Sequence, residues 1–195
     1  MRAMSEHAAT YPCRSGQVVT FITLGEKPKG NLCNHRNTED LNTMTHEVET
    51  TWMGKMQFNA LVGGHTVTMD APERAGGEDL GPIPKPFMLT ALSGCTGMDV
   101  VALLRKAGKQ LERFEVKVSG EISKTPPILY TRVHVLYDMH GDPADQEDAL
   151  AVVQRSQNEI CGVSAMMKKA MPVTWEVRYN DVTVFNNAVV GSTAV

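Results

Sequence analysis

Apolar residues lie in short segments along this chain, and their spacing alternates between the period of a strand and that of a helix. Two strands are predicted over residues 46–62 and 64–70, joined at Gly63-Gly64, a strong hairpin signal. A long apolar segment starts after Pro86, a residue that suits the first turn of a helix, and stops at Gly108. The first part of the pattern therefore predicts a hairpin followed by one long helix.

Three further strands are predicted in the second half of the chain. Phe114 and Val116 alternate with charged neighbours, which is typical of a half-buried strand over residues 111–123. Residues 128–139 and 173–179 have comparable apolar patterns. Hairpin-like spacing favours antiparallel pairing among these strands.

Two helical segments are predicted between the second and third of these strands. Asp142 precedes a proline and is expected to cap a helix that ends near Asn158. A second helix should then carry Cys161, close to its start. The sequence thus predicts an α+β fold with antiparallel sheets and two main helical regions.

Residues 1–43 differ from the rest of the chain. They mix Gly, Pro, Asn, His and isolated charges, and only residues 18–24 resemble a strand. Met44 opens a far more regular segment. We therefore expect a poorly ordered N-terminal extension over residues 1–43 and a folded domain over residues 44–195, with Met44 as an alternative natural start.

Composition narrows the class of protein. The chain has 195 residues, of which 42% are hydrophobic and 21% charged, as in an ordinary globular domain. A formal net charge of −3 argues against a nucleic-acid partner, and no apolar run is expected to span a membrane. Four cysteines do not make a secreted disulfide scaffold, so a cytoplasmic protein with reduced thiols is expected.

Cys95 and Cys161 are the candidate chemical groups, each within an apolar segment of helical pattern. A thiol in such a segment is most simply a small buried hydrophobic group. Two thiols brought together by folding are also able to form a reversible dithiol/disulfide couple. Asp99 shares a helix face with Cys95 and would hydrogen-bond the site, repel a thiolate or make a contact between subunits. Cys13, Cys33 and His35 match no zinc spacing, so no metal or cofactor is expected.

The segment Gly81-Pro-Ile-Pro-Lys-Pro-Phe-Met-Leu-Thr-Ala-Leu-Ser-Gly-Cys95-Thr-Gly-Met-Asp-Val resembles the first cysteine helix of the OsmC/Ohr family. Asn158-Glu-Ile-Cys161-Gly-Val-Ser resembles the second cysteine motif of that family. Trp52-x-Gly54 followed by Phe58 is similar to the first strand of its YhfA-like branch. The resemblance covers about residues 47–179 and leaves out residues 1–43.

The resemblance implies an OsmC-like fold, built as an intertwined homodimer around the cysteine helices. It implies a thiol-dependent peroxidase in which Cys95 attacks an organic hydroperoxide. Cys161 would resolve the resulting sulfenic acid as a disulfide, which a dithiol reductant reopens. Metal, haem and flavin are not needed for that chemistry.

The chain departs from the family pattern around the cation that activates the thiolate. Family peroxidases use an arginine on the first hairpin, oriented by a glutamate near the cysteine helix. Here Lys55 occupies the arginine position, and it lacks the planar guanidinium. Glu78 or Asp79 is a candidate substitute for the glutamate, and Arg74 is a candidate source of a guanidinium. These departures weaken the peroxidase prediction more than the family resemblance.

Two other functions remain open from the sequence. One is an OsmC-like protein without peroxidase activity that binds a small apolar ligand in the dimer cleft. The other is a structural protein whose thiols are buried and inert.

Overall fold

The computed structural model describes residues 7–12, 18–23 and 45–188, in two compact units, Met1–Glu47 and Val48–Val195. In the first unit, β1 (His7–Pro12) pairs antiparallel with β2 (Val18–Thr23), and β2 confirms the strand expected there. Most of the predicted extension, and Met44 with it, lies outside the described residues.

The second unit begins with a three-stranded antiparallel sheet in the order β3-β4-β5. Its strands are β3 (Val48–Gly54), β4 (Gln57–Val62) and β5 (His65–Met69). The prediction of a single strand over residues 46–62 was therefore wrong. The chain reverses at Gly54 and Lys55, which both adopt positive φ angles (116° and 45°), and the Trp52 indole N–H closes this turn on the Lys55 carbonyl oxygen at 3.0 Å.

A second, four-stranded sheet has the order β6-β7-β8-β9. Its strands are β6 (Leu111–Ile122), β7 (Tyr130–Gly141), β8 (Val173–Tyr179) and β9 (Val182–Asn186). The first three confirm predicted strands, whereas β9 was not predicted. β7 and β8 are parallel, contrary to the all-antiparallel expectation, because the chain between them crosses over through helices before it returns to the sheet.

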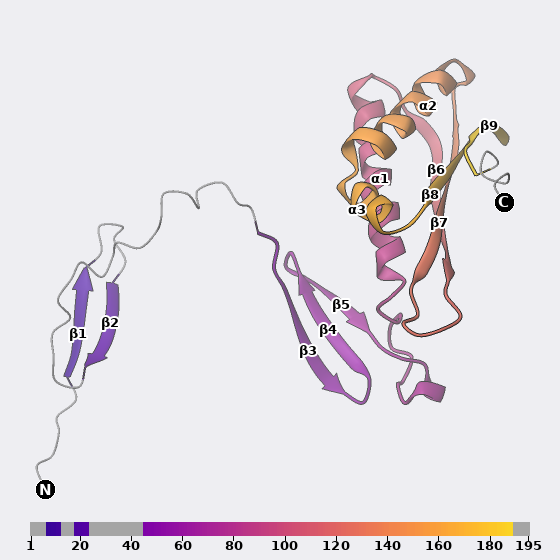
Figure 1. Ribbon diagram of the computed structural model, residues 1–195. Coiled ribbons are helices and arrows are strands. Elements are labelled where there is room, and N and C mark those ends of the chain that lie inside the picture. Colours follow the sequence, from indigo (N-terminus) through magenta and orange to yellow (C-terminus); the bar gives the residue numbers. More distant parts are fainter. Residues whose placement is uncertain (1–6, 13–17, 24–44, 189–195) are drawn as a thin grey trace, which may run out of the picture. The chain divides into compact units, whose positions relative to one another are not determined.

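The helices are α1 (Phe87–Lys106), α2 (Gln146–Arg155) and α3 (Gly162–Ala170), and all three cover one face of the four-stranded sheet (Figure 1). Short 3₁₀ turns occupy Glu73–Ala75 and Pro143–Asp145, and a π-helical turn, Ser156–Ile160, separates α2 from α3. Asp142 caps the 3₁₀ turn Pro143–Asp145 that leads into α2, because its carboxylate accepts the Ala144 N–H at 2.9 Å, whereas the N-cap residue of α2 itself is Asp145.

The core lies between α1, α2 and the four-stranded sheet. Leu92 and Val100 of α1 and Val153 of α2 are fully buried there, against β7 residues such as Val135 and Met139. The helix α1 is long and apolar enough to cross a membrane by length and composition, contrary to the sequence expectation. Its buried face nevertheless makes it the central helix of an α+β domain.

The three-stranded sheet buries little of its own apolar surface. Trp52, Phe58, Leu61 and Val62 are each 40% or more exposed, and Ala60 is the buried hydrophobic residue of these strands. A sheet is stable when one face packs on another layer. The second unit leaves this sheet without such a layer.

Candidate active site

The fold brings Cys95 and Cys161 together. Cys95 lies in the middle of α1, and Cys161 is the residue that caps the N-terminus of α3. Both are free thiols. Their sulfur atoms and a carboxylate oxygen of Asp99 all lie within 4.8 Å of one another. Two predicted site residues therefore meet at one place, next to an acid.

Cys161 is buried, with 3% of its surface exposed. Burial raises the pKa of Cys161 to about 11, and the nearby Cys95 and Asp99 raise it further, whereas the Ser164 N–H, which donates to its sulfur at 3.4 Å, lowers it. The position of Cys161 at the start of α3 would favour a thiolate, but burial has the larger effect on its pKa. Cys161 is a protonated thiol at neutral pH.

Asp99 shares the helix face of Cys95, as its spacing predicts. Its carboxylate accepts a hydrogen bond from the Ser156 hydroxyl at 2.9 Å. Ser156 is fully buried and belongs to the π-helical turn before Cys161. The hydroxyl therefore fixes the orientation of the acid beside the two sulfurs.

A buried polar network continues behind the thiols. The Thr96 hydroxyl lies 2.6 Å from the Tyr137 hydroxyl and 2.9 Å from that of Ser156. The Gln157 amide donates to Tyr137 and accepts the Ser164 hydroxyl at 2.7 Å. Burial raises the pKa of Tyr137 to about 12, so its hydroxyl stays protonated. We call Thr96, Tyr137, Ser156, Gln157 and Ser164 the polar network.

Lysine 168 lies beside this network. The Lys168 ammonium donates to the Gln157 carbonyl oxygen at 2.5 Å and lies 4.7 Å from the centre of the Trp175 ring. Burial lowers the pKa of Lys168, and the neighbouring Cys161 raises it. The sequence motifs did not indicate a site role for Lys168 or for the polar network. The signal that could have indicated one is the group of hydroxyl and amide side chains beside two apolar helix faces.

The other predicted site residues lie on the loops around the three-stranded sheet. Lys55 Nζ forms an ion pair with Glu78 Oε1 at 2.7 Å, and the two side chains are 60% and 50% exposed. Arg74 is exposed in the 3₁₀ turn before Glu78. Within the described part of the chain, no Lys or Arg side chain donates a hydrogen bond to the sulfur of Cys95 or Cys161. Within the described residues the Lys55–Glu78 pair therefore makes no hydrogen bond to either thiol.

Asp70 organises the loop that carries Glu78. The Asp70 carboxylate accepts backbone N–H groups from Ala71 at 2.8 Å, Glu78 at 2.9 Å and Leu80 at 3.2 Å. Burial raises the pKa of Asp70, but these three hydrogen bonds and the charge of Lys55 lower it, and the net shift is downward.

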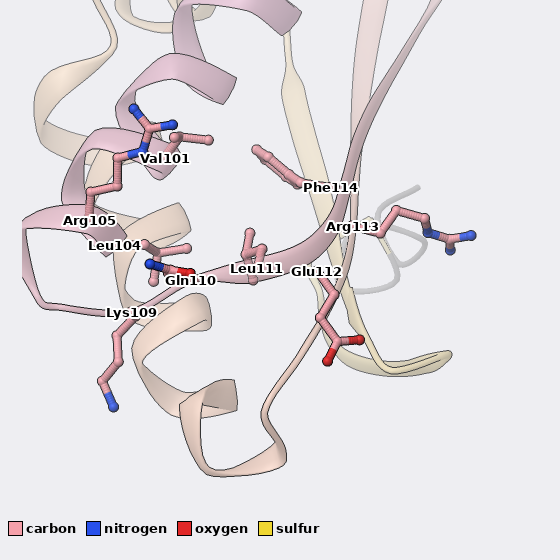
Figure 2. A pocket seen from close by; sticks show the side chains of 9 residues that line it. All are labelled: Val101, Leu104, Arg105, Lys109, Gln110, Leu111, Glu112, Arg113 and Phe114. Atoms are coloured by element: carbon pink, nitrogen blue, oxygen red, sulfur yellow. The ribbon is translucent and has the colours of Figure 1, made fainter.

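Two adjoining cavities lie between α1 and β6. One, of about 440 Å³, is lined by Leu104 and Phe114 together with charged side chains including Arg105 and Lys109 (Figure 2). The other, of about 430 Å³, is mainly apolar and is lined by Gly94, Gly97, Met98 and Val116 among others. The second cavity therefore runs along the helix that carries Cys95.

These features define a class of protein: an α+β domain whose central helix contributes one thiol of a pair and whose separate three-stranded sheet lacks a covering layer. A family model described as OsmC-like protein matches residues 76–176, and the chain belongs to that family. The assignment confirms the OsmC/Ohr resemblance of the two cysteine motifs.

Known proteins agree with this assignment. Protein YhfA of Escherichia coli K12 is 27% identical over 124 residues, which cover 63% of this chain and 90% of YhfA. A hypothetical protein from Aquifex aeolicus VF5 has a similar structure, with a TM-score of 0.57, 23% identity, and coverage of 71% of this chain and 99% of that one. An organic hydroperoxide resistance protein OsmC from Legionella pneumophila also has a similar structure, with a TM-score of 0.53, 17% identity, and coverage of 69% of this chain and 96% of that one. These structures share the fold.

Proposed function

We propose that this protein is a thiol-dependent peroxidase that reduces organic hydroperoxides in the cytoplasm. The observation that carries the proposal is the approach of Cys95 and Cys161 to within 4.8 Å, from two different helices. Membership of a family that includes an organic hydroperoxide resistance protein supports it. Sulfur carries both electrons, so the reaction needs a dithiol reductant.

The reaction has two steps. The Cys95 thiol gives up its proton, the thiolate attacks the terminal peroxide oxygen, and the O–O bond breaks. The alkoxide takes up a proton and leaves as the alcohol, so that protons balance and Cys95 becomes a sulfenic acid. Cys161 then loses its proton and attacks the Cys95 sulfur, and water leaves as the disulfide forms. A dithiol reductant returns both cysteines to thiols and is itself oxidised to a disulfide.

The proposed cation for the first step is Lys55, oriented by Glu78, with Arg74 as the alternative. A positive charge beside Cys95 would stabilise its thiolate and the leaving oxygen. The Lys55–Glu78 ion pair at 2.7 Å supports the first choice, because it reproduces the cation–glutamate pairing that the resemblance implies.

The proposal includes a homodimer in which a second copy covers the three-stranded sheet. Exposed side chains on one face of β3 and β4, with Trp52 63% exposed and Val62 42% exposed, supply an apolar surface that a single chain leaves in water. In this proposal the second copy is also the source of the Lys55 that approaches the thiols, since no described hydrogen bond links Lys55 to either sulfur within one chain.

The test measures hydroperoxide consumption by the reduced protein with a dithiol and cumene hydroperoxide. We expect turnover by the natural sequence and none by Cys95→Ser. One equivalent of peroxide should also remove two hydrogens per chain, and peptide mapping should locate the new bond between Cys95 and Cys161. Turnover no faster than that of Cys95→Ser would refute the peroxidase proposal, and a Cys95 that stops at sulfinic acid would refute the role of Cys161.

The apolar cavity along α1 favours one alternative, a protein that binds a small apolar ligand without turnover. Its volume of about 430 Å³ is within the range of small-molecule sites. Native mass spectrometry of the purified protein tests this alternative, since a bound ligand would survive in the spectrum. If the protein carries no ligand and has no peroxidase activity, the remaining function is that of a structural protein whose thiols are buried and inert.

A further inference from the structure

We propose that the reduced protein binds one zinc-like divalent cation through Cys95, Asp99 and Cys161. One ligand atom from each residue lies within 4.8 Å of the other two. No part of this inference depends on the peroxidase activity. It concerns what the reduced thiol pair holds when no peroxide is present.

The geometry suits a tetrahedral cation. Zn–S bonds of about 2.3 Å and Zn–O bonds of about 2.1 Å place neighbouring ligand atoms roughly 3.5–4 Å apart. The three atoms already lie within 4.8 Å, so a modest side-chain movement brings them to that spacing. Cys95 and Asp99 are one helical turn apart on α1, which puts two ligands on one rigid face. Cys161, at the start of α3, supplies the third ligand from a second helix.

The charge of the cluster also favours a cation. Asp99 forms no ion pair among the residues that the structure describes, and no Lys or Arg there hydrogen-bonds either sulfur. The Asp99 carboxylate completes a set of three anionic ligands once both thiols lose their protons to a metal. The three ligands together therefore suit a divalent cation.

Neighbouring groups already orient two of the ligands. The Ser156 hydroxyl donates to Asp99 at 2.9 Å, and the Ser164 N–H donates to the Cys161 sulfur at 3.4 Å. Hydrogen bonds of this kind orient the ligands of metal sites and tune their basicity. Two thiolates select zinc-like cations over Mg²⁺ and Ca²⁺, and three protein ligands leave a fourth position for water.

The experiment uses the full chain with Cys13→Ser and Cys33→Ser, so that the thiols of the extension cannot bind metal. The reduced, metal-free protein is titrated with Co²⁺, which reports thiolate ligation by charge-transfer absorption, and then with Zn²⁺. We expect one cation per chain, displacement of Co²⁺ by Zn²⁺, and no binding after diamide has oxidised the pair. Cys95→Ser and Cys161→Ser should remove the charge-transfer absorption or halve it.

Asp99→Asn and Ser156→Ala separate a three-ligand site from two thiols that bind metal unaided. We expect each to weaken binding by about 10- to 100-fold, while Glu147→Gln, an exposed acid in the first turn of α2, leaves the affinity unchanged. Circular dichroism identifies any variant that does not fold, and Ser156→Ala keeps all three ligands. Absence of thiolate absorption, or full affinity in both Asp99→Asn and Ser156→Ala, would overturn the proposal. A metal-binding protein that consumes no peroxide would overturn only the proposed function.

Discussion

Lys55 Nζ lies 2.7 Å from Glu78 Oε1, and this ion pair connects the turn between β3 and β4 to the loop that precedes α1. Lys55 lies in that turn with a φ of 45°. Both groups are at least half exposed, and exposed ion pairs stabilise a fold by at most about 1 kcal/mol. The ion pair therefore contributes little to the free energy of unfolding. Its loss is expected to change the peroxidase activity rather than the stability.

Glu78→Gln should lower peroxidase activity without unfolding the protein. The substitution keeps the size of the side chain but removes the charge that orients Lys55. We expect the second-order rate constant for cumene hydroperoxide to fall about 10-fold or more, which corresponds to at least ~1.4 kcal/mol of transition-state stabilisation. The free energy of unfolding in urea should change by less than about 1 kcal/mol.

Lys55→Arg and Lys55→Met together test whether the positive charge of Lys55 activates the Cys95 thiolate. Arginine keeps the charge and adds a planar fork, so it should retain the activity of the natural sequence or exceed it. Methionine keeps the length without the charge and should behave like Glu78→Gln. Equal rates for the arginine and methionine variants would show that Lys55 is not the activating cation and would direct attention to Arg74.

Most of the fold could be predicted because its elements have strong local patterns. The helix predicted after Pro86 is α1, and the strand predicted over residues 173–179 coincides with β8. The turn at Lys55 was missed because a non-glycine residue with positive φ leaves little trace in the sequence. The parallel direction of β8 was missed because strand direction depends on the crossover through α2 and α3, not on the strand itself.

Thr96→Val should destabilise the protein, because Thr96 is fully buried and joins Tyr137 to Ser156. Valine has the same shape but leaves both hydroxyl groups short of a partner. We expect a loss of roughly 1–3 kcal/mol in the free energy of unfolding, measured in urea at one fixed protein concentration. Thr90→Val, an exposed substitution on the same helix, is the control and should cost under about 0.5 kcal/mol. Equal costs at both positions would mean that the polar network contributes nothing.

Phe58→Asp should prevent dimer formation if a second copy covers the three-stranded sheet. Phe58 lies on β4, the central strand of that sheet, directly opposite Trp52 and on the same face, and it is 40% exposed in the single chain. A charge there would have to be buried at the interface, which is costly without a partner. Light scattering after size exclusion should show a smaller assembly than for the natural sequence. Val182→Asp on β9, at 61% exposure, is the control, and an unchanged mass for both variants would contradict the dimer proposal.

The site was less predictable than the fold, since its contacts join residues that are distant in the sequence. The motifs indicated both cysteines, and helical spacing placed Asp99 on the face of Cys95. The contacts of Ser156 with Thr96 and Asp99 depend on the π-helical turn, which no sequence pattern predicted. Packing of α1 on that turn decides these contacts, and packing is not encoded in local periodicity.

Asp70 should make stability depend on pH in the acid range. Its folded-state pKa is lowered, because the N–H groups of Ala71, Glu78 and Leu80 and the charge of Lys55 outweigh its burial. A lowered folded pKa stabilises the protein above the unfolded pKa of about 3.9, and that contribution is lost as the pH falls through the folded value. Urea unfolding at several pH values should therefore show the natural sequence more stable than Asp70→Asn by a constant amount between pH 7 and about pH 5. Below about pH 4 the difference should shrink. A difference that stays constant to the lowest pH would mean that the Asp70 charge does not hold the loop, and Asp79→Asn, which removes an exposed acid from the same loop, should leave the pH profile unchanged.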